Sequence, residues 1–252
     1  RNFVTFLCRE KAMSKSEFIV VCGLVLIVFT LVAQAADITP QRGGGAVGGT
    51  VAPMIMPEIT FDGTNIVVMK ADGVTPWETL TGANRPIMRT LTGTDTLASN
   101  QAWYGPLNGT AWNWQYGWAN AALDQGLIPA GSKIWIELLD QSSGLKTYDR
   151  NSANLYGEIF GTPDLVTGEV SPMIWKWYET ASMSHNAYTV TPGVGEYYAN
   201  YKVYIGDATT GAALTNYGYD TVTLTWTSIP EPATLVLMGT GLICFLRSKK
   251  QK

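Results

Sequence analysis

Short stretches in which apolar and polar residues alternate run through the middle of the chain. From Glu196 to Ile205 apolar side chains recur at every second position, and from Thr221 to Trp226 three apolar residues alternate with three threonines. Successive side chains of a strand point to opposite faces, so a period of two is typical of strands with one buried face. These segments therefore predict antiparallel strands.

Two further pairs of strand-like segments are each separated by residues that favour turns. The pairs are residues 59–61 and 66–70 around Asp62-Gly63-Thr64-Asn65, and residues 133–139 and 145–148 around Asp140-Gln141-Ser142-Ser143-Gly144. Apolar and aromatic runs on either side of such turns predict β-hairpins. The aromatic segment from Ile174 to Glu179 predicts one more strand.

Helical patterns are rare in the same region. Only Trp118 to Leu127, which is rich in alanine and contains Gly126 near its end, predicts a short helix. Glycine is abundant, and threonine, tyrosine and tryptophan are frequent. Together with the strand patterns, this composition predicts an all-β fold, a single antiparallel β-sandwich or jelly-roll-like domain over residues 57–228.

Two longer apolar runs lie outside the strand pattern, one towards each end. The first, Phe18 to Val32, follows charged residues and precedes Ala33-Gln34-Ala35, the small-x-small pattern that signal peptidase requires. We therefore expect residues 1–35 to be a secretory signal peptide with an N-terminal signal helix, cleaved after Ala35. Met13 is the expected start, with residues 1–12 a spurious extension, and a buried helix or permanent signal anchor is the alternative.

Residues 36–56 are rich in glycine and predict a flexible linker. Gly43, Gly45 and Gly48 have the spacing of a dinucleotide-binding loop. That loop works only between a strand and the start of a helix, and neither is expected here. The glycines are therefore interpreted as a spacer.

The second apolar run forms part of residues 229–252. Pro230-Glu231-Pro232-Ala233 precedes the run from Thr234 to Leu246, and a basic end follows it. A helix of the 14 residues from Ala233 to Leu246 would be about 21 Å long, which is short for a hydrocarbon core of about 30 Å. The pattern predicts a short transmembrane helix whose basic end stays in the cytoplasm, so that the middle of the chain lies outside it.

This combination resembles the PEP-CTERM sorting signal. The resemblance implies an exported protein of a Gram-negative bacterium, held transiently at the inner membrane and processed by an exosortase before it reaches the cell surface or extracellular matrix. By the same resemblance, the recognition residues would be Pro230, Glu231 and Pro232, and the basic stop signal would be Arg247, Lys249, Lys250 and Lys252. An ordinary C-terminal anchor that is never processed is the alternative.

Charge and cysteine usage exclude several functions for the middle of the chain. Residues 36–228 contain nine Lys/Arg and 17 Asp/Glu, a net charge of −8, which phosphate backbones would repel. Nucleic acid is therefore not an expected partner. Cys8, Cys22 and Cys244 all lie in the terminal segments, so we expect no disulfide and no Cys-ligated zinc in the domain, and we expect no cofactor.

The densest aromatic segment contains Trp112, Trp114 and Tyr116 at every second position. On a regular strand these rings would share one face. An exposed stripe of this kind could stack on sugar rings, and the three residues are therefore candidates for carbohydrate binding. The alternative is that they fill the core, because a tryptophan can bury up to about 250 Å². Trp175 and Trp177 pose the same choice.

Catalytic signals are weak. His185 is the only histidine, and neither a nucleophile elbow nor a zinc-protease motif is present. Candidate carboxylates for glycoside cleavage are Glu137, Glu158, Asp164 and Glu169. We expect no catalytic residue, with His185 on a loop.

Taken together, these features predict a non-enzymatic surface or matrix protein whose partners are signal peptidase, an exosortase, the inner membrane and an exopolysaccharide. A secreted glycosidase or lyase on a β-sandwich is one alternative. A purely structural surface component is the other.

Overall fold

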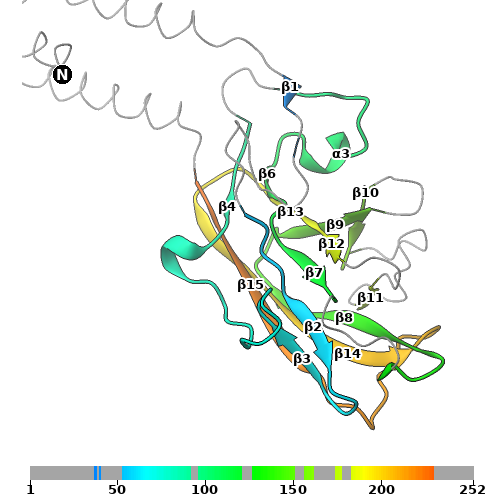
Figure 1. Cartoon of the computed structure of the whole chain (residues 1–252). Helices are drawn as coiled ribbons and strands as arrows, with labels where there is room; N and C mark the ends of the chain where they lie inside the picture. The colour runs from blue at the N-terminus through cyan, green and yellow to red at the C-terminus, as the bar shows by residue number, and fades with distance from the viewer. Residues whose placement is uncertain are drawn as a thin grey trace, which may run out of the picture.

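The computed structural model describes residues 37–38, 40, 53–91, 96–120, 127–150, 156–161, 174–177 and 183–229. These residues form mostly β-strands (Figure 1), which confirms the predicted all-β class. Among them, no helix combines the length and the apolar character needed to cross a membrane. The expected signal helix and C-terminal helix lie outside the described residues.

A five-stranded sheet forms one layer. Its strands, in spatial order, are β11 (Ile174–Lys176), β8 (Ser132–Gln141), β14 (Gly195–Asp207), β15 (Asp220–Ser228) and β4 (Ile87–Met88). β14 pairs with β8 and β15 in antiparallel fashion, whereas β4 joins β15 in parallel. The alternating positions Tyr201, Val203 and Ile205 are buried, as a period of two on a half-buried strand requires.

Two four-stranded sheets face this layer. One consists of β12 (Met183–His185), β7 (Gly117–Ala119), β2 (Glu58–Phe61) and β3 (Ile66–Met69). The other consists of β10 (Tyr156–Ile159), β9 (Lys146–Arg150), β13 (Ala187–Val190) and β6 (Ala111–Asn113). Residues from all three sheets form the main hydrophobic core. Because β2 and β7 also pair in parallel, the sheets are mixed, and the prediction of a purely antiparallel fold was wrong in this respect.

A smaller hydrophobic cluster lies beside β6. It contains Leu97, Leu107, Trp112, Trp114 and Ala187. The short helix α3 (Tyr104–Leu107) contributes Leu107, and β5 (Thr96–Leu97), which pairs in parallel with β1 (Asp37–Ile38), contributes Leu97. A short 3₁₀ turn, η1 (Gly82–Asn84), lies in the segment that leads to β4.

The first predicted hairpin is confirmed, and the second is wrong. β2 and β3 pair around a turn in which the Asp62 carboxylate accepts hydrogen bonds from the backbone N–H groups of Thr64 and Asn65. β8 and β9 do form, but they belong to different sheets. After β8 the chain crosses between layers, and the Ser142 N–H donates to the Tyr198 carbonyl of β14 instead of to β9.

Two other expectations also change. Trp118, the first residue of the predicted helix, lies in β7, where Trp118 is paired with Ser184 of β12; residues 121–126 lie outside the described part of the chain. Ile55 and Met56, assigned to the linker, belong to the folded domain: the Ile55 N–H donates to the Gln115 carbonyl, and Met56 is buried. The folded domain therefore begins before residue 57.

Candidate functional site

The aromatic segment predicted as a possible carbohydrate platform is buried. Trp112 and Trp114 are each 1% exposed, and Tyr116 is fully buried. Tyr116 is in the main core, where its ring meets that of Trp226 edge to face at 5.2 Å, whereas Trp112 and Trp114 are in the smaller cluster. Of the two alternatives that the sequence left open for these rings, burial therefore favours the hydrophobic core over a carbohydrate platform.

One extra residue between β6 and β7, relative to the strands they pair with, explains why the three rings are divided between two clusters. β6 and β13 pair so that Asn113 lies opposite Tyr188, and β7 and β12 pair so that Gly117 lies opposite His185. Three residues separate Asn113 from Gly117, whereas only two separate His185 from Tyr188 on the partner strands. An extra residue on one strand bends it and interrupts the alternation. The bend lets one continuous ribbon contribute strands to both four-stranded sheets.

His185 has a structural place in this bend. It ends β12, is 4% exposed, and its Nδ1 lies 3.3 Å from the Tyr116 carbonyl oxygen. Its own carbonyl accepts a hydrogen bond from Trp114 Nε1 at 3.2 Å. His185 was expected on a loop, and the structure places it on a buried strand. Trp175 and Trp177 are likewise buried, in the main core.

The candidate carboxylates are not gathered in one place by the described structure. Glu137 on β8 pairs with Lys202 at 3.2 Å, and Glu158 on β10 pairs with Lys146 at 2.8 Å, in a different sheet. Asp164 and Glu169 lie outside the described residues. The hydrogen bond from Lys146 to Glu158 raises the pKa of that amine.

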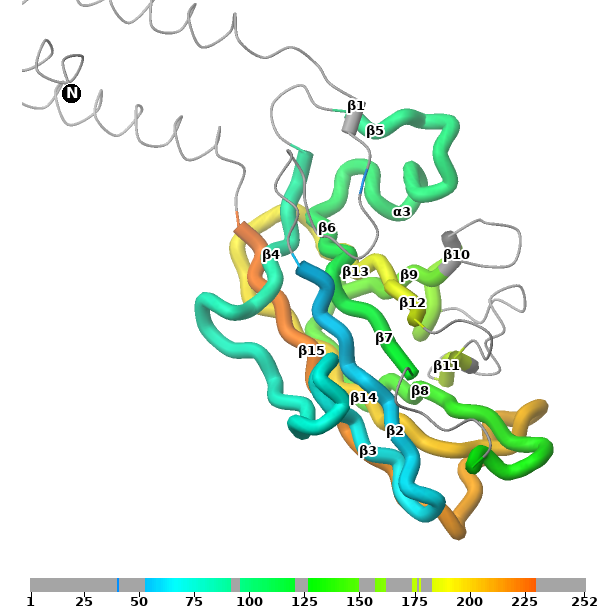
Figure 2. The backbone as a smooth tube through the Cα atoms, viewed as in Figure 1, coloured from blue at the N-terminus to red at the C-terminus, as the bar shows by residue number. Residues whose placement is uncertain are grey.

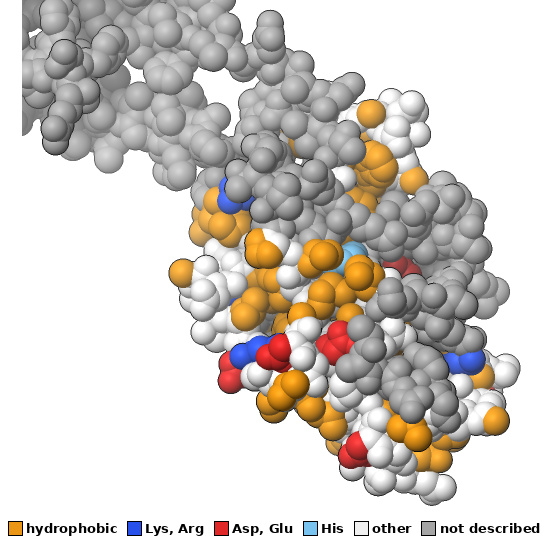
Figure 3. All heavy atoms as spheres, in the orientation of Figure 1, with side chains coloured by type: hydrophobic (Ala, Val, Ile, Leu, Met, Phe, Trp, Pro, Cys, Tyr) orange, Lys and Arg blue, Asp and Glu red, His pale blue; other side chains and the backbone are white. Residues whose placement is uncertain are grey.

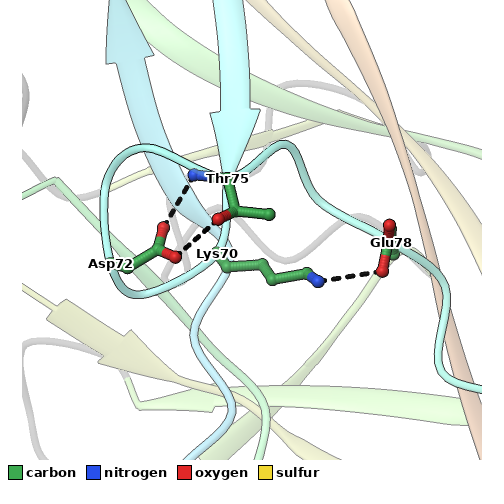
Figure 4. A network of polar contacts seen from close by, with 4 residues as sticks. All are labelled: Lys70, Asp72, Thr75 and Glu78. Carbon is green, nitrogen blue, oxygen red and sulfur yellow. Dashed lines mark hydrogen bonds and ion pairs between the residues drawn. The ribbon is translucent and has the colours of Figure 1, made fainter.

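Other aspartates stabilise turns. Asp72 accepts hydrogen bonds from the Thr75 hydroxyl at 2.7 Å and from the Thr75 N–H at 2.8 Å, next to an ion pair of Lys70 with Glu78 (Figure 4). These bonds lower the pKa of Asp72 to about 2, and the bond from the Thr75 hydroxyl has the largest effect. Within the described ranges no group of three or more His, Cys, Asp or Glu side chains could hold a metal ion.

The outward face of the five-stranded sheet carries polar and aromatic side chains. The ammonium of Lys202 lies 4.7 Å from the centre of the Tyr204 ring and 5.0 Å from that of Tyr219, which is 61% exposed. Two positions back on β14, the Asn200 amide oxygen accepts a hydrogen bond from Thr223 at 2.7 Å. Two further back, the partly exposed Tyr198 donates its hydroxyl hydrogen to Asp140 at 2.8 Å. Alternation along β14 places these side chains on one face.

The last residue of β15, Ser228, lies between β14 on one side and β4 on the other. Ser228 is fully buried, lies opposite Gly195 of β14 and is in register with Met88 of β4. Its hydroxyl donates to the Gly193 carbonyl at 2.7 Å, and the preceding Thr227 N–H donates to the Pro86 carbonyl at 2.9 Å. The fold therefore extends to within two residues of Pro230.

Two residues at this end, Arg89 and Val194, were not singled out by sequence reasoning. Neither belongs to a recognisable motif, and only the pairing of β4 and β14 with β15 brings them together. The predicted sorting residues Pro230, Glu231 and Pro232, the basic residues after them, and the cleavage residues Ala33 and Ala35 lie outside the described residues. Their roles stay predictions.

Comparison with known protein families supports the interpretation of the C-terminal segment. No curated protein and no solved structure matches the chain at a significant level. The model of the PEP-CTERM protein-sorting motif matches residues 228–250, so its first residue is Ser228, the last residue of β15. The chain thus carries a PEP-CTERM protein-sorting motif that begins where its β-domain ends.

Proposed function

We propose that this chain is a non-enzymatic cell-surface or extracellular-matrix protein that an exosortase sorts through its C-terminal motif. In this proposal signal peptidase removes residues 1–35, the tail holds the β-sandwich domain at the inner membrane, and processing releases the domain to the surface. The observation that carries the proposal is the match to the sorting motif over residues 228–250, directly after the last strand.

The test compares the native host with a strain that lacks its exosortase. In the parent strain we expect the protein at the cell surface with a mass lower than that of the chain from Ala36 to Lys252. In the mutant strain we expect the full tail and retention in the inner membrane. A variant in which Pro230 and Pro232 are alanine should behave as in the mutant strain, and a Thr64→Ala variant as the parent. Equal masses in both strains would refute exosortase processing.

The outward face of the five-stranded sheet supports exopolysaccharide as the ligand class. Tyr198 and Tyr219 offer partly exposed rings for stacking, and Asn200, Lys202 and Glu137 offer hydrogen-bonding groups on the same face. This face replaces the buried segment around Trp112 as the candidate site.

Electrophoresis through a gel containing the host exopolysaccharide tests this second proposal. The parent protein should be retarded, and a Tyr198→Ala, Tyr219→Ala double variant should migrate faster, with Thr64→Ala as the control. Equal retardation of all three would rule this face out as the binding site. Release of reducing ends during incubation would instead favour the enzymatic alternative.

A further inference from the structure

The strand pairing at the end of β15 sets two side chains beside the point where the sorting motif leaves the fold. Gly195 lies opposite Ser228 in the antiparallel pair, so Val194 is the next residue of that chain beyond the pair. Met88 is in register with Ser228 in the parallel pair, so Arg89 continues alongside Ile229. Val194 and Arg89 therefore flank Ile229 on its two sides.

This end of the molecule combines apolar exposure with a positive charge that no ion pair among the described residues balances. Val194 is 77% exposed, in an exposed loop, residues 191–194, that contains no charged residue. Arg89 is exposed and makes no ion pair in the part of the chain that the structure describes. The acidic residue of β14 at this end, Glu196, is paired with Arg85. Figure 3, in the orientation of Figure 1, shows a basic patch beside hydrophobic side chains at this end of the domain.

The tail is too short to hold this end far from a membrane. The apolar run begins at Thr234, five residues after Ile229. Five residues span at most about 17 Å when fully extended. A headgroup layer about 5 to 7 Å thick takes part of that length and leaves a gap of at most about 10 to 12 Å. The Debye length is about 8 Å at physiological ionic strength, so charges at this end of the domain and on the lipids attract each other once the tail is less than fully extended.

We propose that the end of the domain formed by Val194, Arg89 and Ile229 is a contact surface for an anionic phospholipid membrane. Arg89 would be attracted by lipid phosphates, and Val194 would enter the interface between headgroups and acyl chains. The β2–β3 and β14–β15 turns lie at the opposite end of the domain, far from the end of β15 (Figures 1 and 2). This inference rests on the proposed function, because it requires the tail to be in the bilayer before processing.

Single-cysteine labelling tests the contact on the chain from Ala36 to Lys252, reconstituted into vesicles. Cys244, its only native cysteine, reports on the tail. A Val194→Cys variant and a Thr64→Cys control at the β2–β3 turn, both with Cys244→Ser, report on the two ends of the domain. An environment-sensitive fluorophore on each cysteine is quenched by brominated phosphatidylcholine only where the label reaches the acyl chains. Vesicles with and without phosphatidylglycerol are compared.

We expect quenching at positions 244 and 194 but not at 64, and stronger quenching at 194 when phosphatidylglycerol is present. Loss of the charge in Arg89→Gln should weaken the contact about fivefold, as about 1 kcal/mol per basic residue implies, whereas Arg89→Lys should retain it. Quenching at 244 with none at 194, or a contact unaffected by Arg89→Gln, would overturn the contact surface alone. Absence of quenching at 244 would instead overturn the membrane-held tail, and with it the proposed function.

Discussion

Replacement of Trp112 by alanine separates a structural role of the aromatic segment from a binding role. Trp112 is 1% exposed and packs in a cluster with Leu97, Leu107 and Trp114. Its backbone pairs with Arg89 through two hydrogen bonds of 3.0 Å, which the substitution leaves in place. The change therefore removes the side chain from the core while the local strand pairing is kept.

The expected loss of stability is large. Truncation of a buried tryptophan to alanine typically costs about 3 to 5 kcal/mol. The buried indole Nε1 of Trp112 has no hydrogen-bond partner among the residues that the structure describes, and removal of such a donor returns about 1 to 3 kcal/mol. The middles of these two ranges differ by about 2 kcal/mol, and we therefore expect Trp112→Ala to lower the free energy of unfolding by about that amount, a sizeable part of the stability of a typical domain.

Urea unfolding followed by far-ultraviolet circular dichroism measures this change, on a chain that ends at Ile229. Tyr219→Ala, which truncates a ring that is 61% exposed, is the matched control and should stay within about 0.5 kcal/mol of the parent. A Trp112→Ala variant that unfolds at the same urea concentration as the parent would refute the burial of this ring. The hypothesis that the aromatic segment around Trp112 binds carbohydrate would then have to be reconsidered.

Two further substitutions test local geometry. In Gly117→Ala the new Cβ would lie 2.6 Å from the Ser184 carbonyl oxygen, so we expect urea unfolding to show a loss of about 1 to 3 kcal/mol, whereas Gly105→Ala meets nothing within 4 Å. Asp72 has a pKa of about 2 in the fold against 3.8 ordinarily, first because of the Thr75 hydroxyl. The contribution of the Asp72 carboxylate to the free energy of unfolding is therefore fully present above pH 3.8 and is lost as the pH falls towards 2. Thermal unfolding of Asp72→Asn across this range should depend less on pH than that of the parent; an equal dependence would contradict the assignment.

The all-β class was predictable because the period of two is a local property of each strand. β2, β3, β14 and β15 were all found within a few residues of their observed bounds. Pairing between strands is not local, and the failure at β8 and β9 shows the consequence. A turn sequence can join neighbouring strands or carry the chain between layers, and the choice depends on which sheet buries each apolar face.

The choice between core and platform for the aromatic segment could not be made from the sequence, for a different reason. Alternation of Trp112, Trp114 and Tyr116 was real in the sequence, but one extra residue relative to the partner strand sends Tyr116 into another cluster. Whether a residue is extra depends on the partner strand, which lies some 70 positions later in the chain. The proposed contact surface around Arg89 and Val194 could not be predicted from the sequence for the same reason, because two distant strand pairings bring these residues together.

Burial of the aromatic rings also changes what the abundance of tryptophan means. Six of the nine tryptophans have side chains less than 2% exposed, and the region between the two terminal segments contains no cysteine. Exported domains that cannot build a sufficient core commonly rely on disulfides, but a chain of this length can bury enough apolar surface without them. Large rings provide much of that surface. The tryptophan content is therefore explained by the stability of the core, and the residues proposed to contact partners lie on the outward sheet face and at the end of β15.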